Sequence, residues 1–146
     1  MSHLPLHAYV PGQTPRHRDG AFDALRATAR KGMTPAELAE CAAFVSGLLY
    51  VEDGYYWEAH EVLEPVWMLL PEGSADRYAV QAVIQIANAR LKARMGRPGA
   101  VYRLCDMAEE LAEQGRGNGM GLKPARLADW IAATRFMTNR ITGSAV

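Results

Sequence analysis

Side chains able to do chemistry are concentrated in residues 55–67, whose sequence is YYWEAHEVLEPVW. His60 and Glu64 are four residues apart, so on a helix their side chains share one face and can hydrogen-bond. A histidine oriented by a carboxylate can transfer protons near neutral pH, and the same two groups can bind a metal ion. We therefore interpret His60, Glu61 and Glu64 as candidate catalytic residues, with His60 and Glu64 as candidate metal ligands.

The helical wheel of this segment places His60 and Glu64 at the edge of a broad apolar arc. Trp57 and Trp67 bracket the pair on the wheel, so they are candidate pocket walls. Because aromatic residues at helical spacing are often simply core residues, a structural role for this segment stays open.

Two other glutamates, Glu58 and Glu61, fall on a different arc of the wheel and are predicted to face solvent. Pro65 has no N–H, and its ring opposes the carbonyl group of Glu61. It also disfavours the α conformation at Glu64, so we expect a kink or break in the helix there.

A row of polar side chains follows on the next predicted helix, within about 60° on its wheel. Apolar residues flank the row on both sides. Buried amides need hydrogen-bond partners, and the edge formed by His60 and Glu64 is the candidate, which would make a polar seam between consecutive helices. The alternative is an uncharged row that faces solvent. The candidate pocket residues in the row are Gln81, Gln85, Asn88 and Lys92.

A metal ion would need more ligands than His60 and Glu64 supply, since structural zinc sites use four protein ligands and catalytic sites three. The second histidine of the metalloprotease pattern is missing, and Trp57 stands where a di-iron bundle would have glutamate. A divalent metal would have to recruit Glu61, His17 or an amide oxygen. The sequence therefore favours a protein without a cofactor, and a divalent metal ion is the alternative.

Two motifs give the chain a family resemblance. Residues 58–67 read EAHEVLEPVW, and residues 80–92, VQAVIQIANARLK, are followed by GRPGA at 96–100. With these motifs the chain resembles domain-of-unknown-function family 309, small helical proteins of bacteria and archaea, over roughly residues 44–111. The resemblance implies a compact all-helical fold and a recurrent cluster of His60, Glu61, Glu64 and Trp67. It implies no established activity.

Length and composition indicate one modest core: the chain has 146 residues, is 49% hydrophobic and has zero formal net charge. No apolar run approaches the ~20 residues that span a bilayer, and the N-terminal residues lack the apolar core of a signal peptide. We expect a cytoplasmic protein without membrane contact. Cys41 and Cys105 lack the close spacing of a redox or zinc motif and are predicted to be reduced core thiols.

Helix signals cover the chain after an N-terminal leader. Thr34 and Glu37 form a capping box around Pro35, and Ser74 is a predicted N-cap. We predict an all-α, single-domain bundle of about six helices with short loops. An extended leader at 1–18 precedes the helical domain at 19–146. The expected helices are 19–30, 34–52, one carrying His60 between turns at 53–54 and 71–74, 75–95, 100–114 and 124–141.

Charge is unevenly distributed although it sums to zero. Residues 52–64 contain five acids and no base, whereas residues 90–103 contain five bases and no acid. The economical interpretation is that these segments face one another within the fold or across a homodimer. The alternative is that the basic segment 90–103 binds phosphate groups, although overall neutrality and the absence of a reading motif argue against nucleic acid.

Three functional hypotheses follow. The first is a module that binds a small ligand or a protein through a polar pocket or network of histidine, glutamate and amide groups between two helices. The second is a metal-dependent or acid/base enzyme, hydrolase-like, centred on His60, Glu61 and Glu64. The third is phosphate or nucleic-acid binding through segment 90–103. The sequence does not decide whether a reaction is catalysed, and it identifies no substrate.

Overall fold

The computed structural model describes residues 4–116 and 119–143, and all regular structure in those ranges is helical. The predicted all-α class is therefore confirmed. The elements are α1 (Asp23–Arg26), α2 (Pro35–Glu40), α3 (Ala42–Asp53), α4 (Tyr56–Leu69), α5 (Ala75–Arg94), α6 (Pro98–Gly115), the 3₁₀ turn η1 (Gly119–Gly121) and α7 (Pro124–Gly143).

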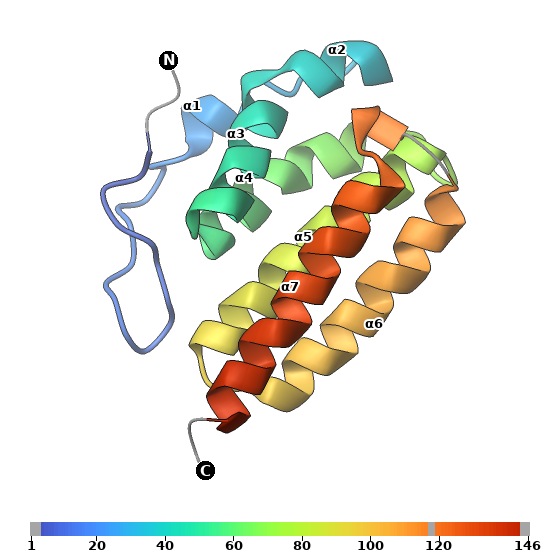
Figure 1. Cartoon of the computed structure of the whole chain (residues 1–146). Helices are drawn as coiled ribbons and strands as arrows, with labels where there is room; N and C mark the ends of the chain where they lie inside the picture. The colour runs from blue at the N-terminus through green and yellow to red at the C-terminus, as the bar shows by residue number, and fades with distance from the viewer. Residues whose placement is uncertain (1–3, 117–118, 144–146) are drawn as a thin grey trace.

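The central element is α5, which packs against α4, α6 and α7 (Figure 1). In the figure α5, α6 and α7 run side by side, while α3 and α4 pack together at one flank. Because α5 has neighbours on several sides, most of its apolar residues are buried, from Ala79 to Ala93. This explains why apolar residues flank the polar row on both sides in the sequence.

The predicted helix caps are present. The amide N of Glu37 donates to Thr34 Oγ1 at 3.1 Å, and the amide N of Thr34 donates to Glu37 Oε1 at 2.8 Å. Hydrogen bonds with the backbone and, secondly, the side chain of Thr34 lower the pKa of the Glu37 carboxyl. Ser74 Oγ accepts from the amide N of Arg77 at 3.1 Å. Each cap satisfies N–H groups that the first helical turn leaves free, so these starts follow from local sequence.

Thr28 changes two of the predicted helices. Its Oγ1 donates to the carbonyl O of Leu25 at 2.7 Å, and α1 is only four residues long instead of filling 19–30. The same Oγ1 accepts from the amide N of Ala43 at 2.8 Å, in the first turn of α3. The predicted helix 34–52 is consequently divided at Cys41, whose ψ of 151° is extended. A threonine side chain thus competes with helical hydrogen bonding at two places.

Of the kink or break expected at Pro65, the break is wrong, since α4 runs through this residue from Tyr56 to Leu69. Pro65 leaves the carbonyl O of Glu61 without its helical donor. Arg26 Nη1 donates to that same oxygen from α1. A side chain from a distant segment therefore satisfies the group that the proline leaves free.

The leader follows the flank of the bundle without helix in its described part, residues 4–18 (Figure 1). Val10 is buried against Tyr56 and Leu91, so the leader contributes to a small apolar cluster of its own. The division into a leader at 1–18 and a domain at 19–146 stays a prediction. Residues 1–3, 117–118 and 144–146 of these units lie outside the described residues.

The two cysteines are free and buried, which confirms the prediction of reduced core thiols. Burial raises the pKa of the Cys105 thiol, so this thiol is a poor nucleophile at neutral pH. Within the described ranges, no helix combines the length and the apolarity needed to cross a membrane.

Candidate functional site

The structure brings His60 to the polar row of α5. His60 Nδ1 lies 2.8 Å from Asn88 Oδ1, and His60 Nε2 lies 3.2 Å from Glu64 Oε2. Asn88 Nδ2 donates to Gln85 Oε1 at 3.4 Å. A polar seam between α4 and α5 is therefore present. The side chains of His60 and Glu64 are 37% and 42% exposed, so their contact is worth at most about 1 kcal/mol.

The other predicted site residues point elsewhere. Glu61 faces Arg26 Nη1 at 3.1 Å, and the ring of Trp57 packs on the leader, with Tyr9 at 5.2 Å between centroids. Trp67 lies under the guanidinium of Arg77, which is 4.4 Å from its ring centroid. The remaining members of the row are half-buried on α5: Gln81 and Lys92.

A metal centre is not supported by the placement of ligands. In residues 4–116 and 119–143, no group of three or more His, Cys, Asp or Glu side chains is arranged to hold an ion. His60 and Glu64 are two ligands, and Glu61 is engaged by Arg26. Two side chains fall short of the three protein ligands usual for catalytic zinc.

We predict that His60 and Asn88 stabilise the packing of α4 on α5. His60→Ala should lower the free energy of unfolding by about 1 kcal/mol, the usual worth of one hydrogen bond. In a double-mutant cycle with Asn88→Ala, measured by urea denaturation, the two effects should fall short of additivity by about 0.5 kcal/mol or more. Strict additivity would show that the pair does not interact.

Elemental analysis of the parent and His60→Ala proteins tests the metal hypothesis separately. About one metal ion per chain in the parent protein, lost in His60→Ala, would restore that hypothesis.

The prediction that Glu58 faces solvent is wrong, because its side chain is fully buried. Its Oε2 accepts from the amide N of Tyr9 at 2.7 Å and lies 2.6 Å from His17 Nε2. Its Oε1 is buried without a hydrogen-bond partner among the described residues. One carboxylate of α4 thus contacts the leader at two places, at Tyr9 and at His17. A buried carboxylate needs such partners, since burial alone would be costly.

His17 is held on several sides. Its ring stacks on His7 with 4.5 Å between centroids, and the edge of Phe22 meets it at 5.0 Å. Because Glu58 is an acceptor, the hydrogen bond requires a hydrogen on Nε2, which leaves Nδ1 as the second ring nitrogen. This histidine and carboxylate pair has the composition of an acid/base site, although periodicity did not reveal it. His17 lies in the leader, and only the fold brings it to Glu58.

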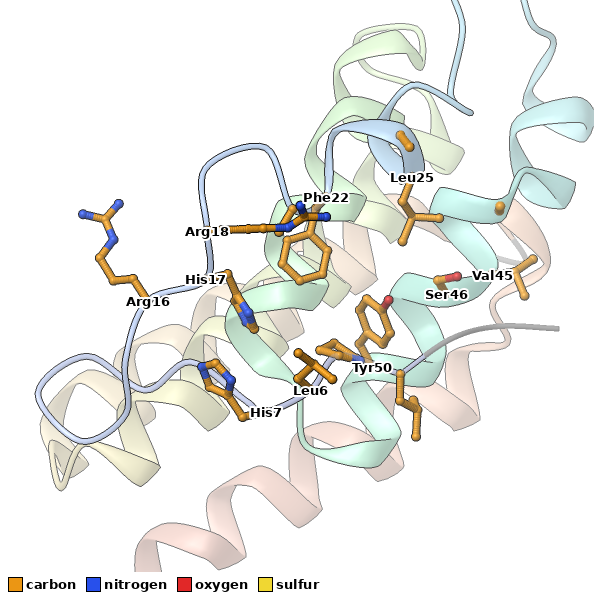
Figure 2. A pocket seen from close by; sticks show the side chains of 15 residues that line it. Leu6, His7, Arg16, His17, Arg18, Phe22, Leu25, Val45, Ser46 and Tyr50 are labelled. Carbon is orange, nitrogen blue, oxygen red and sulfur yellow. The ribbon is translucent and has the colours of Figure 1, made fainter.

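A cavity of about 750 Å³ lies between the leader, α1 and α3 (Figure 2). Its walls are mainly apolar, and none of its described lining residues is Asp or Glu. Burial, and secondly the charge of Glu58, raises the pKa of the Tyr50 phenol, so Tyr50 presents a neutral hydroxyl. The labelled lining residues in the figure are Leu6, His7, Arg16, His17, Arg18, Phe22, Leu25, Val45, Ser46 and Tyr50.

A second, smaller cavity of about 230 Å³ adjoins the first, and the two share Arg16, His17, Arg18, Ala21 and Phe22. Its lining is more polar and includes Arg26, Glu61 and Trp57. The sequence pattern predicted neither cavity, because their shared lining comes from the leader and the segment that follows it. His60 lines neither of the two.

The acidic and basic segments meet within the fold, where Arg94 contacts Gly54 and Tyr56, but among the described residues no salt bridge joins them, and a contact across a homodimer stays a prediction. Glu52 pairs with Arg126 at 2.7 Å, and Glu58 and Glu61 pair with His17 and Arg26. The first base of segment 90–103, Arg90, is buried. It donates to Thr134 Oγ1 and to the carbonyl groups of Val51 and Trp130.

Arg94 also has a structural role in segment 90–103, since its Nη1 donates to the carbonyl O of Gly54. The same guanidinium lies over the ring of Tyr56, 4.5 Å from the centroid. Arg90 and Arg94 therefore hold the C-terminal end of α3, and only part of the basic segment is left for a phosphate-bearing partner.

These features define an all-α bundle whose N-terminal leader closes one side of a cavity of small-molecule size. Residues 44–104 match the model of the family described as a domain of unknown function, DUF309. This match confirms the resemblance seen in the sequence over these residues. The matched segment includes Glu58 and His60 but not the leader. Comparison with curated proteins and with solved structures finds no match to the chain.

Proposed function

We propose that this protein is a binding module for a small, largely apolar molecule, which it holds in the cavity between the leader, α1 and α3. The observation that carries the proposal is the cavity itself, at about 750 Å³ with mainly apolar walls. Ligand sites of proteins typically measure about 300–1,000 Å³ and are lined by apolar and aromatic side chains with a few polar groups. Cytoplasmic residence is part of the proposal.

Support for a preformed site comes from the way in which its walls are fixed. The leader is tied to α4 by Glu58, and Val10 buries against Tyr56. Within the leader, Thr14 Oγ1 accepts from the amide N of Val10 at 2.7 Å. On the opposite wall, Ser46 and Tyr50 are buried residues of α3. A site with fixed walls binds at a lower entropic cost than one that must order on binding.

The row around His60 has a different role in this proposal. His60, Glu64 and Asn88 are engaged with one another, and Glu61 with Arg26. We therefore treat this row as a polar contact between α4 and α5, and we place the ligand at the leader. The enzyme hypothesis centred on His60, Glu61 and Glu64 gains no support from these contacts.

Octan-1-ol tests the proposal because it is neutral, apolar and small enough for the cavity. We expect it to bind and to raise the midpoint of thermal unfolding. Ala42→Phe should weaken its affinity by about tenfold or more, since the new ring projects from a residue that lines the cavity. Binding is measured by calorimetry.

The matched control is Ala132→Phe, an exposed alanine of α7 that lines neither cavity. This variant should bind octan-1-ol as the parent protein does. Equal affinity in the parent and Ala42→Phe proteins, or no binding to the parent at all, would contradict the proposal.

A further inference from the structure

We infer that the ligand of the leader cavity carries an anionic head group, a carboxylate or a phosphate monoester, on its apolar body. This inference rests on the proposed function and specifies its ligand class. It starts from the charges of the cavity wall. Arg16 and Arg18 line the cavity, together with His7 and His17, and none of its described lining residues is acidic. A cavity lined by one sign of charge concentrates ligands of the opposite sign.

The basic side chains of the wall all come from the leader, and none comes from α1 or α3. Figure 2 shows His7 and His17 together on the side of the leader, with the guanidinium of Arg16 pointing away from their rings, whereas Leu25 and Val45 lie on the side of α1 and α3. An amphipathic molecule fits this division with its head group at the leader and its chain against the helices. A purely apolar ligand would leave the cationic side without a partner.

The two arginines have capacity for an anion. Within the described residues, neither Arg16 nor Arg18 forms an ion pair with a carboxylate, and both side chains are largely exposed at the cavity. A guanidinium group binds a carboxylate or phosphate through two parallel hydrogen bonds. These arginines therefore differ from Arg26, which is occupied by Glu61 and Glu64.

The nearby acids do not cancel this preference. Glu58 is buried beneath His17 and paired with it, so it does not line the cavity. Asp19, Asp23 and Glu61 line the smaller cavity together with Arg16, Arg18 and Arg26, so bases balance acids there, and Arg26 pairs with Glu61. His17 shields Glu58 from the head group, and its remaining ring nitrogen is a hydrogen-bonding group that Glu58 does not use.

The experiment compares ligands with the same eight-carbon chain and different head groups: octanoate, octyl phosphate, octan-1-ol and octylammonium. Calorimetric titration of the full chain should show octanoate or octyl phosphate binding about tenfold more tightly than octan-1-ol, and octylammonium binding most weakly. Arg18→Gln should weaken the binding of the anions several-fold more than it weakens the binding of octan-1-ol. Added salt should also reduce the preference for the anions over octan-1-ol, because salt screens exposed charges.

Arg103→Gln is the control, since Arg103 is an exposed arginine of α6 that lines neither cavity. It should keep the preference of the parent protein. Equal or tighter binding of octan-1-ol than of both anions would overturn the inference and leave the proposed function standing. An anion preference that Arg18→Gln and Arg103→Gln retain equally would also overturn it. If none of the four ligands binds, the proposed function itself fails.

Discussion

Replacing Glu58 by alanine should destabilise the protein by about 3 kcal/mol and release the leader. Removing one member of a buried ion pair typically costs about 3–5 kcal/mol, because its partner is left without compensation. Here His17 would lose its acceptor, and so would the amide N of Tyr9. We expect the lower end of the range, because a detached leader can return both groups to water. Urea denaturation measures the loss of stability.

Limited proteolysis reports release of the leader itself. Trypsin cleaves after Arg16 and Arg18, which lie beside His17, and cleavage follows the population of the open form when opening is fast. Each 1.4 kcal/mol of weaker docking should accelerate cleavage about tenfold. A Glu58→Ala protein that is cleaved at the parental rate would show that Glu58 does not hold the leader.

Two comparison variants separate charge from shape at this position. Glu58→Gln keeps an acceptor for the amide N of Tyr9 and removes the charge, so it should cost about 1–2 kcal/mol. Glu61→Ala removes an acid of the same helix whose side chain is 37% exposed and paired with Arg26. Its cost should stay near or below about 1 kcal/mol, as for other partly exposed ion pairs. Equal losses in Glu58→Ala and Glu61→Ala would contradict the special role of the buried carboxylate.

Glu58 also connects the segment that matches the family model, residues 44–104, to the rest of the chain. It lies within residues 44–104, whereas its partners Tyr9 and His17 lie in the leader. A carboxylate buried on α4 requires donors from somewhere. In this chain the leader supplies them, and in doing so it forms one wall of the proposed binding cavity. The stability of the leader and the integrity of the cavity therefore depend on the same side chain.

The features that sequence reasoning found are those fixed by neighbouring residues. The capping box of Thr34 and Glu37, the cap at Ser74 and the helix end at Gly54 each depend on contacts within a few positions. The contact between His60 and Asn88 was also accessible, because both belong to consecutive amphipathic helices. Hydrophobic periodicity is sufficient to bring such faces together.

The features that were missed depend on contacts distant in sequence. Thr28 ends α1 and caps α3 across 15 residues, and Arg26 satisfies the carbonyl of Glu61 across 35. Glu58 is buried by a leader whose sequence has no helical period, so a wheel of α4 alone places it in solvent. No local rule specifies which distant side chain meets an unsatisfied group. The cavity forms where the leader docks, so local sequence rules could not predict it either.

The second large effect is expected at the contact between α3 and α4, where Gly47 faces Leu63. A Cβ atom added at Gly47 would lie 2.4 Å from Leu63 Cδ2 and 2.5 Å from Leu63 Cγ. Leu63 is fully buried in the core, so its side chain has little room to move aside. Overpacking typically costs about 1–3 kcal/mol, against a gain of about 1 kcal/mol from alanine in a helix. Because two Leu63 atoms would lie within 2.5 Å of the new Cβ atom, the overpacking cost should be at the upper end of its range, and we expect Gly47→Ala to lower the free energy of unfolding by about 2 kcal/mol after the helix gain is subtracted.

A second substitution at the contacted residue makes this prediction specific. Leu63→Ala alone should cost about 2–5 kcal/mol through the cavity it leaves. In that background the obstructing atoms are gone, so Gly47→Ala should become neutral or stabilising. The control is Gly99→Ala in α6, where an added Cβ meets nothing within 4 Å and no destabilisation is expected. If Gly47→Ala destabilises the parent and Leu63→Ala proteins equally, Leu63 is not the obstacle, and close packing of α3 on α4 is not what requires glycine at this position.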